Sequence, residues 1–172
     1  EVFAGVSPSV RTFVVTRRGR RFGLFVNPPG NPDNLITAAA LDRYVLGLDL
    51  FRVLRVPIVS LLDTPGGDPR DNSEVVGRFW QTAQRIIDYP HRRMGVVIGR
   101  AYGGAIMLGF PRFFGSDGTY VLEGASLGQM HPQIIDSLLA TSKRLAAEWN
   151  AAKAAQTKDC SDIVAAGIIH GV

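Results

Sequence analysis

The feature that most constrains the fold of this chain is the alternation of short apolar runs with segments of helical periodicity. The runs VPIVSLLD (residues 56–63) and RMGVVIG (93–99) are almost continuously apolar and rich in β-branched side chains, as strands buried on both faces are. Residues 37–53 and 73–89 instead carry apolar side chains at three- and four-residue spacing, which indicates amphipathic helices. Strands that alternate with helices predict crossover connections. We therefore expect an α/β fold with a mostly parallel sheet and helices on its faces.

The rest of the chain extends this pattern at both ends. Residues 11–16 and 21–29 have the character of two strands joined by an arginine-rich turn. Four further elements are predicted downstream: a short helix at 104–110, a strand near 118–124, a long helix at 134–155 and a short helix within 159–172. A chain of 172 residues with 46% hydrophobic residues can bury one core but is short for two. We therefore expect a single domain over residues 1–172.

Charge and composition exclude several classes of protein. The formal net charge is +4, and much of the basic excess lies in the turn TRRGRRF, which fits a hairpin with solvated arginines. Aromatic residues are not interleaved with the basic ones, so no nucleic-acid platform is expected. Apolar runs end before the roughly 18 residues that a membrane span needs, and no export signal is visible, which favours a cytoplasmic protein without membrane contact. The lone Cys160 excludes a disulfide framework, and no metal site is predicted.

Two glycine-rich turns follow the two buried strands directly. DTPGGD (63–68) follows the first strand and RAYGGA (100–105) the second, so both turns belong to the crevice beyond the carboxyl ends of the strands, where α/β proteins bind ligands. Backbone N–H groups of glycines are unobstructed by a Cβ, and two converging N–H groups form an oxyanion hole. A helix beginning at residue 104 would add the positive end of its dipole. The candidate catalytic residues are therefore Gly66, Gly67, Gly103 and Gly104. The alternative is that these glycines only permit close packing of helix against strand.

The order of these motifs resembles the carboxyltransferase family of the crotonase superfamily. The similarity is to the C-terminal half of the carboxyltransferase subunit of biotin-dependent acyl-CoA carboxylases and decarboxylases. That half carries a D-x-P-G-F turn, matched here by Asp63, Pro65 and Gly66, followed by R-K-A-[FY]-G-G-A, matched here by residues 101–105. Upstream strands and the closing segment AAGIIHGV are also similar, so the resemblance spans nearly the whole chain. It implies a crotonase (ClpP/crotonase-like) spiral fold.

The resemblance also implies a reaction. It predicts carboxyl transfer on a thioester-bound acyl substrate, in a component of an acyl-CoA carboxylase, transcarboxylase or decarboxylase. Such chemistry needs stabilised oxyanions more than a protein nucleophile, which fits a site made of backbone N–H groups. The pocket would be lined by Tyr102, Ala105, Met130 and His131. Acyl-CoA would be the substrate, and biotin would arrive on a separate protein, because the chain lacks a Met-Lys-Met attachment sequence.

Partners follow from the same resemblance. The family forms its active site between one half and the other half of a partner, and this chain resembles only the second half. An oligomer with an N-terminal-half carboxyltransferase protein, a biotin carrier protein or both is therefore expected. Three positions depart from the family pattern: Gly67 replaces an aromatic residue, His131 replaces a glycine, and Gln133 replaces an acid.

Two alternatives remain open. A non-catalytic structural subunit of a carboxyltransferase-like complex would fit the departures at Gly67 and Gln133. A ClpP-like serine peptidase would share the superfamily, and QMHPQ is similar to the peptidase histidine segment. Gly103, however, stands at the position of the peptidase nucleophile and has no side chain to attack with.

Overall fold

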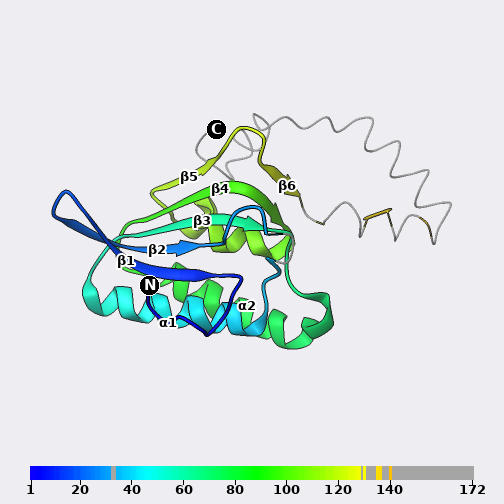
Figure 1. Cartoon of the computed structure of the whole chain (residues 1–172), viewed down its shortest axis with the longest axis horizontal. Helices are drawn as coiled ribbons and strands as arrows, with labels where there is room; N and C mark the ends of the chain where they lie inside the picture. Colours follow the sequence, from blue (N-terminus) through cyan, green and yellow to red (C-terminus); the bar gives the residue numbers. More distant parts are fainter. Residues whose placement is uncertain (32–33, 129, 131–134, 137–139, 141–172) are drawn as a thin grey trace.

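The computed structural model describes residues 1–31, 34–128, 130, 135–136 and 140 (Figure 1). Within these residues one six-stranded sheet has the order β1-β2-β3-β4-β5, and β6 also pairs with β4. Its strands are β1 (Arg11–Arg17), β2 (Arg20–Val26), β3 (Ile58–Thr64), β4 (Arg93–Tyr102), β5 (Gly118–Val121) and β6 (Ser126–Gly128). Its helices are α1 (Ala38–Leu54), α2 (Asn72–Ile87) and the short 3₁₀ helices η1 (Pro69–Asp71), η2 (Gly103–Gly109) and η3 (Arg112–Phe114).

The sheet is mainly parallel, as predicted. Among the described strands only β1 and β2 pair antiparallel; the pairs β2–β3, β3–β4 and β4–β5 are parallel. Strands β5 and β6 pair with successive parts of β4, so β6 lies against its last three residues, 100–102. The carboxyl end of β4 is thereby held between β3 and β6.

Helices α1 and α2 lie on the same side of the sheet (Figure 1). Each connects two neighbouring parallel strands, α1 from β2 to β3 and α2 from β3 to β4. Arg78 of α2 pairs with Asp42 of α1, and Arg85 pairs with Asp49, each pair being 36 residues apart in sequence. The constant separation shows that the two helices run parallel to each other.

The core lies between the sheet and these helices. Phe25 of β2 stacks on Tyr44 of α1 with ring centroids 4.5 Å apart, and it meets Phe51 edge-on at 5.4 Å. The apolar stripe predicted for residues 37–53 therefore faces the sheet. The side chain of Thr37 caps the helix by accepting a hydrogen bond from its first turn.

Other predicted boundaries agree with the structure to differing degrees. The helix predicted at 73–89 is α2, and the strand predicted near 118–124 is β5, which ends at Val121. The short strand β6 was not predicted, because three residues carry too little periodicity to be recognised. The helices predicted at 134–155 and within 159–172 lie outside the described residues, apart from isolated positions.

The segment after β4 differs from its prediction. A short helix was predicted at 104–110, and the structure has the 3₁₀ helix η2, which begins one residue earlier. Positive φ angles at Gly103 (59°) and Phe110 (52°) confine the helix to seven residues, and short helices of this kind commonly adopt 3₁₀ geometry. The predicted short helix is therefore present as a 3₁₀ helix, and its start lies at Gly103 and not at Gly104.

Close backbone contact fixes η2 against the sheet. A Cβ on Gly95 of β4 would lie 1.5 Å from the carbonyl oxygen of Gly109, so no residue with a side chain fits there. Leu108 and Ala105 of η2 are fully buried in the core. The glycine turn at the start of η2 is thus held in place by the packing of the whole short helix.

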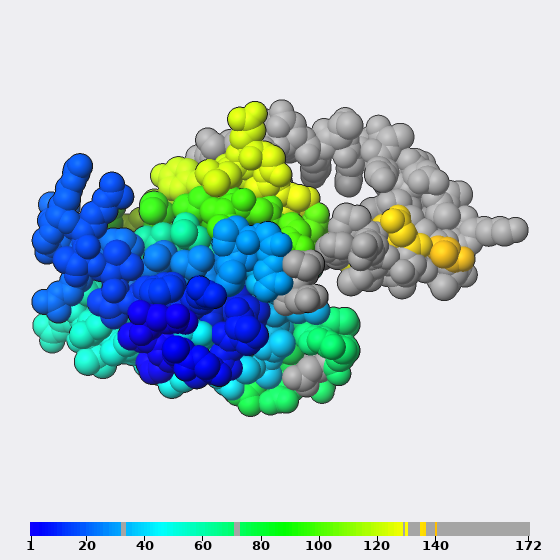
Figure 2. Space-filling model, viewed as in Figure 1, coloured from blue at the N-terminus to red at the C-terminus, as the bar shows by residue number. Residues whose placement is uncertain are grey.

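The arginine-rich turn between β1 and β2 projects from the body of the molecule (Figure 2). Its four arginines are exposed, as expected for a solvated hairpin: Arg17, Arg18, Arg20 and Arg21. No helix in the described part of the chain is long and apolar enough to cross a membrane.

Candidate active site

The glycine turns after β3 and β4 lie beside each other at the carboxyl edge of the sheet, as predicted. Thr64 pairs with Ala101 across the two strands. A Cβ placed on Gly66 would lie 3.5 Å from the carbonyl oxygen of Tyr102. The first turn therefore contacts the residue that immediately precedes Gly103.

The four candidate glycines differ in what their N–H groups do. The N–H of Gly66 donates to Thr64 Oγ1 at 3.2 Å, so this group is engaged within its own turn. The N–H of Gly67 makes no hydrogen bond to the residues that the structure describes. Gly103 and Gly104 begin η2, where the first N–H groups have no acceptor inside the helix. The N–H of Gly67 is thus unengaged among the described residues, whereas those of Gly103 and Gly104 lack only an acceptor within η2.

A short segment before α1 holds the first turn in its conformation. Ile36 donates its N–H to the carbonyl oxygen of Gly66 at 2.8 Å and accepts from the N–H of Asp68 at 2.9 Å. The hydroxyl of Thr64 donates to the carbonyl oxygen of Asn34 at 2.6 Å. These bonds hold the residues on both sides of Gly67, while the N–H of Gly67 itself bonds to none of the described residues.

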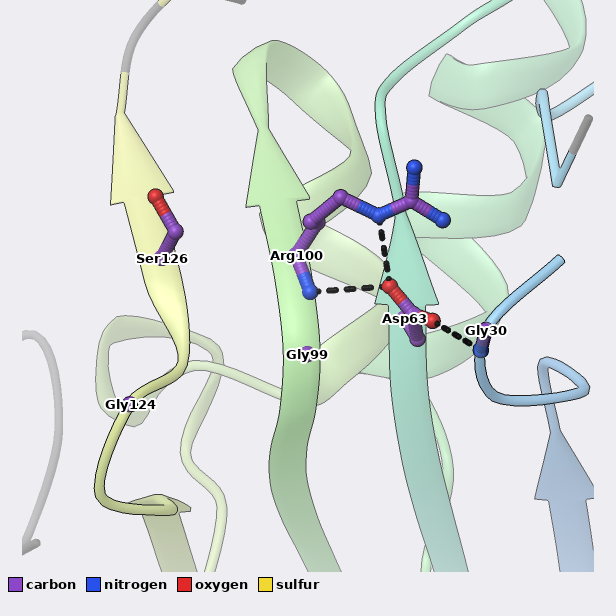
Figure 3. Close-up of a pocket in the computed structure, with 6 residues that line it drawn as sticks. All are labelled: Gly30, Asp63, Gly99, Arg100, Gly124 and Ser126. Carbon is purple, nitrogen blue, oxygen red and sulfur yellow. Dashed lines mark hydrogen bonds and ion pairs between the residues drawn. The ribbon is translucent and has the colours of Figure 1, made fainter. Parts of the chain in front are cut away.

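Asp63 links the carboxyl end of β3 to that of β4 through hydrogen bonds, on the side of the sheet that faces away from α1 (Figure 3). Its Oδ1 accepts from the backbone N–H of Arg100 at 2.9 Å and from Arg100 Nε at 2.8 Å, and its Oδ2 accepts from the N–H of Gly30 at 3.0 Å. A Cβ on Gly99 would lie 2.6 Å from Asp63 Cγ, so the carboxylate can reach β4 only because residue 99 is glycine.

The environment of Asp63 favours its charged form. Burial alone would raise the pKa of this carboxyl, but the hydrogen bonds from Arg100 and Gly30 outweigh burial and hold the pKa below its ordinary value. Asp63 therefore carries a negative charge that Arg100 balances at neutral pH.

A cavity of about 390 Å³ opens beside this ion pair. Ser60 of β3 faces α1, since its hydroxyl lies 3.5 Å from that of Tyr44, and alternation along the strand directs Asp63 to the opposite face. The cavity beside Asp63 therefore lies on the face of β3 that points away from α1. Its lining consists of Gly30, Asp63, Gly99, Arg100, Gly124 and Ser126 (Figure 3).

The residues predicted to line the pocket differ in burial and in hydrogen bonding. Tyr102 is buried, and its hydroxyl lies 2.5 Å from Ser126 Oγ. Ala105 is fully buried, so only its backbone could meet a ligand. Met130 follows β6 and is 40% exposed, whereas His131 lies outside the described residues. Among the described residues, no group of three His, Cys, Asp or Glu side chains could hold a metal ion.

Phe79 of α2 is the site residue that sequence reasoning missed. The helical periodicity of the sequence identifies Phe79 only as one of the apolar residues on one face of α2, together with Val75 and Ile86. In the structure its ring lies near both turns: a Cβ placed on Gly67 would be 3.7 Å from Phe79 Cε2, and one on Gly104 would be 3.9 Å from Cε1. No local signal could have shown this, because the contact joins three segments that are distant in sequence.

The chain is similar to known proteins both in sequence and in fold. The chain is 26% identical over 133 residues to the methylmalonyl-CoA carboxyltransferase 12S subunit of Propionibacterium freudenreichii subsp. shermanii, a match that covers 76% of this chain and 25% of the relative. It superposes on the transcarboxylase 12S structure, a hexamer with methylmalonyl-coenzyme A bound, with a TM-score of 0.75 and 19% identity over 95% of this chain and 34% of that one. The chain is thus similar to carboxyltransferases in sequence and in fold.

Two further carboxylases are similar to this chain in fold. The β subunit of Pseudomonas aeruginosa geranyl-CoA carboxylase matches with a TM-score of 0.68 and 16% identity over 79% of this chain and 26% of that one. A single-chain, multi-domain long-chain acyl-CoA carboxylase matches with a TM-score of 0.72 and 21% identity over 95% of this chain and 18% of that one. The predicted crotonase-like α/β fold is therefore confirmed. No protein-family model matches the chain, which spans about a quarter of the curated relative.

Proposed function

We propose that this chain is a carboxyltransferase component that moves a carboxyl group to or from a thioester-bound acyl group, with acyl-CoA as the substrate. The observation that carries the proposal is the meeting of two glycine turns, one with the unengaged N–H of Gly67 and the other with Gly103 and Gly104 at the start of η2. The relationship to a methylmalonyl-CoA carboxyltransferase supports the same reaction class.

The chemistry asks for stabilised oxygen anions. Removing or adding a carboxyl group at the carbon next to a thioester places negative charge on the thioester oxygen, and N–H groups aimed at that oxygen lower the barrier. Loss of one such donor costs about 3 kcal/mol of transition-state stabilisation in enzymes with an oxyanion hole. In this proposal the N–H groups of Gly67, Gly103 and Gly104 are the donors, while Gly66 shapes the first turn.

Biotin fits the same donors. A ureido group presents a carbonyl oxygen, which is the acceptor that backbone N–H groups bind, so the glycine turns suit it as well as they suit a thioester. Bound biotin would supply or take up the carboxyl group. The chain's own contribution is to hold both carbonyl groups in place. The carrier of biotin would be a separate protein, as the sequence indicates.

Partners are part of the proposal. The related 12S subunit forms a hexamer within a multienzyme core, and this chain spans 34% of that subunit. We therefore propose an oligomer that contains an N-terminal-half carboxyltransferase protein, a biotin carrier protein or both, located in the cytoplasm.

Replacement of Gly104 tests the site. In Gly104→Val the added methyl groups would meet the Phe79 ring, because even a Cβ would lie 3.9 Å from Phe79 Cε1. Displacement of the N–H donors should lower carboxyl transfer from methylmalonyl-CoA by about 100-fold or more, measured by chromatography of the acyl-CoA products of the assembled complex. Gly77→Val on α2 is the matched control, since a Cβ there meets nothing within 4 Å.

The possible outcomes separate the candidate functions. Full activity of a folded Gly104→Val protein would contradict the oxyanion role of this turn. If the unaltered assembled complex neither binds nor turns over acyl-CoA, the structural-subunit alternative gains support instead.

A further inference from the structure

The hairpin between β1 and β2 carries positive charge that nothing near it balances. The chain has 19 basic and 15 acidic residues, so the four arginines of this hairpin account for the whole formal charge of +4. All ion pairs between the described residues involve other arginines of the chain. The hairpin is called the arginine hairpin below, and its exposed arginines are Arg17, Arg18, Arg20 and Arg21.

The backbone of the arginine hairpin holds these charges close together. Residues 11–17 pair with residues 20–26 in unbroken register, which leaves a turn of two residues. Arg17 lies directly opposite Arg20, and like charges placed in this way destabilise a sheet. Arg18 has a φ of 50° and Gly19 a φ of 74°, in a type of turn that favours asparagine or glycine at the first of these positions. The isolated chain therefore bears two unfavourable features at the arginine hairpin.

The arginine hairpin lies at the opposite end of the sheet from the glycine turns. β2 runs parallel to β3, and Gly23 pairs with Ile58 at the start of β3, whereas the first glycine turn follows the last residue of β3. The length of strand between the hairpin and the glycine turns corresponds to about 30 Å. The hairpin also stands out from the body of the molecule (Figure 2). A protein bound to it would leave the glycine turns uncovered.

The residues of the hairpin suit the carboxylates of another protein. Guanidinium groups bind carboxylates through paired, charge-assisted hydrogen bonds, and arginine is enriched at protein interfaces. Residues 16–21 contain no aromatic side chain on which a base could stack and no apolar side chain that could enter a lipid surface. Nucleic-acid binding through phosphates alone takes about six to ten contacts, which exceeds the four charges present. An acidic protein segment is therefore the favoured partner.

We infer that the arginine hairpin is a docking surface for an acidic segment of a partner protein. Carboxylates bound there reduce the repulsion between Arg17 and Arg20, which the isolated chain cannot relieve. The positive φ of Arg18 keeps a fourth guanidinium at the tip, and strain of this kind is typical of functional positions. The inference does not depend on the proposed reaction, because the hairpin and the glycine turns lie at opposite ends of the sheet.

Reversal of one charge tests the docking surface. A fluorescein-labelled glutamate oligopeptide is the probe, and fluorescence anisotropy at low ionic strength measures its binding to the full chain. Arg17→Glu replaces the like-charge pair with an ion pair to Arg20, so this variant should unfold at a higher temperature and yet bind the probe about tenfold more weakly. Arg112→Glu is the matched control, since it makes the same change of charge at an exposed position on η3. It should bind the probe nearly as tightly as the unaltered protein.

A second variant removes a charge while it favours the turn. Asparagine followed by glycine is the preferred sequence for a two-residue turn with positive φ at both positions. Arg18→Asn should therefore raise the unfolding temperature and weaken binding of the probe about threefold. Because neither Arg17→Glu nor Arg18→Asn is expected to destabilise the fold, loss of binding in them reports on the hairpin itself.

Several results would overturn the inference. Equal weakening in Arg17→Glu and Arg112→Glu would show that net charge, and not the hairpin, determines binding. Equal binding of a glutamine oligopeptide would exclude recognition of carboxylates. Tighter binding of an oligodeoxythymidylate of the same length, or of phosphatidylserine vesicles, with loss in Arg17→Glu, would assign the hairpin to nucleic acid or to lipid instead. None of these results bears on the proposed function, which turnover of acyl-CoA tests separately.

Discussion

Asp63 shows how one buried side chain positions two turns. It accepts hydrogen bonds from Gly30 and from two groups of Arg100, and its own strand continues directly into the first glycine turn. A carboxylate can accept all three bonds, whereas an amide presents N–H donors to some of the same partners. Asp63 is therefore a positioning residue that holds the turns without contacting the proposed substrate.

The variant Asp63→Asn should lower the free energy of unfolding by about 2 kcal/mol at neutral pH, because charge-assisted hydrogen bonds are lost. Urea denaturation measures this difference. The control Asp49→Asn removes an exposed pair with Arg85 and should change the stability by about 0.5 kcal/mol or less. Equal effects of the two variants would contradict a special role for Asp63.

The pH dependence of this difference has a defined sign. The pKa of Asp63 is lower in the folded protein than its ordinary value of 3.8, so the folded state favours the charged carboxylate. The stabilisation is complete above pH 3.8 and is lost as the pH falls through the lower, folded-state pKa. The difference between the unaltered protein and Asp63→Asn should therefore be constant near neutral pH and shrink below pH 3.8.

At the scale of elements, α2 is fixed at its end by Arg93. The guanidinium of Arg93 donates to the carbonyl oxygens of Ile86 and Ile87 in the last turn of the helix region, and to that of Gly115 at 2.9 Å. A positive charge at a helix C-terminus satisfies carbonyl groups that have no intrahelical donor. Arg93 thus joins α2 to β4 and to the segment after η3.

Separate replacement of two adjacent arginines tests whether Arg93 anchors the end of α2. Arg93→Met should destabilise the protein by about 3 kcal/mol, because several buried carbonyl groups lose their donor. Arg92→Met should cost about 0.5 kcal/mol or less, since the Arg92 side chain is 83% exposed and makes only a surface pair with Asp117. Thermal unfolding followed by circular dichroism measures both, and a similar loss for the two would exclude the proposed anchoring of α2.

At the scale of the whole molecule, the proposal requires another protein. The match covers 25% of the curated relative, so that protein is about four times as long as the matched region. A tagged form of this chain should co-purify with an N-terminal-half carboxyltransferase protein or with a biotinylated protein detected by labelled streptavidin. An unrelated tagged protein is the control. Carboxyl transfer by this chain alone, at the rate of the assembled complex, would contradict the need for a partner.

Much of the architecture could be predicted from local patterns. Strand and helix periods identified β3, β4, α1 and α2, and the sequence placed both glycine turns directly after buried strands. The type of η2 could not be predicted, because it depends on backbone contact between Gly95 and Gly109 and on positive φ angles at its two ends. Strand β6 was too short to be recognised, and it became visible only through its pairing with β4.

The sequence by itself determined that the chain alternates strands and helices, that it resembles the carboxyltransferase family, and that glycines follow two buried strands. These properties depend on residue order over short distances, which periodicity and motifs record directly. Tertiary structure alone decided that Gly66 lies near Tyr102, that Asp63 binds Gly30 and Arg100, and that the Phe79 ring lies near both turns. Those contacts join residues far apart in the chain, and parallel strand pairing brings them together only after the sheet has formed.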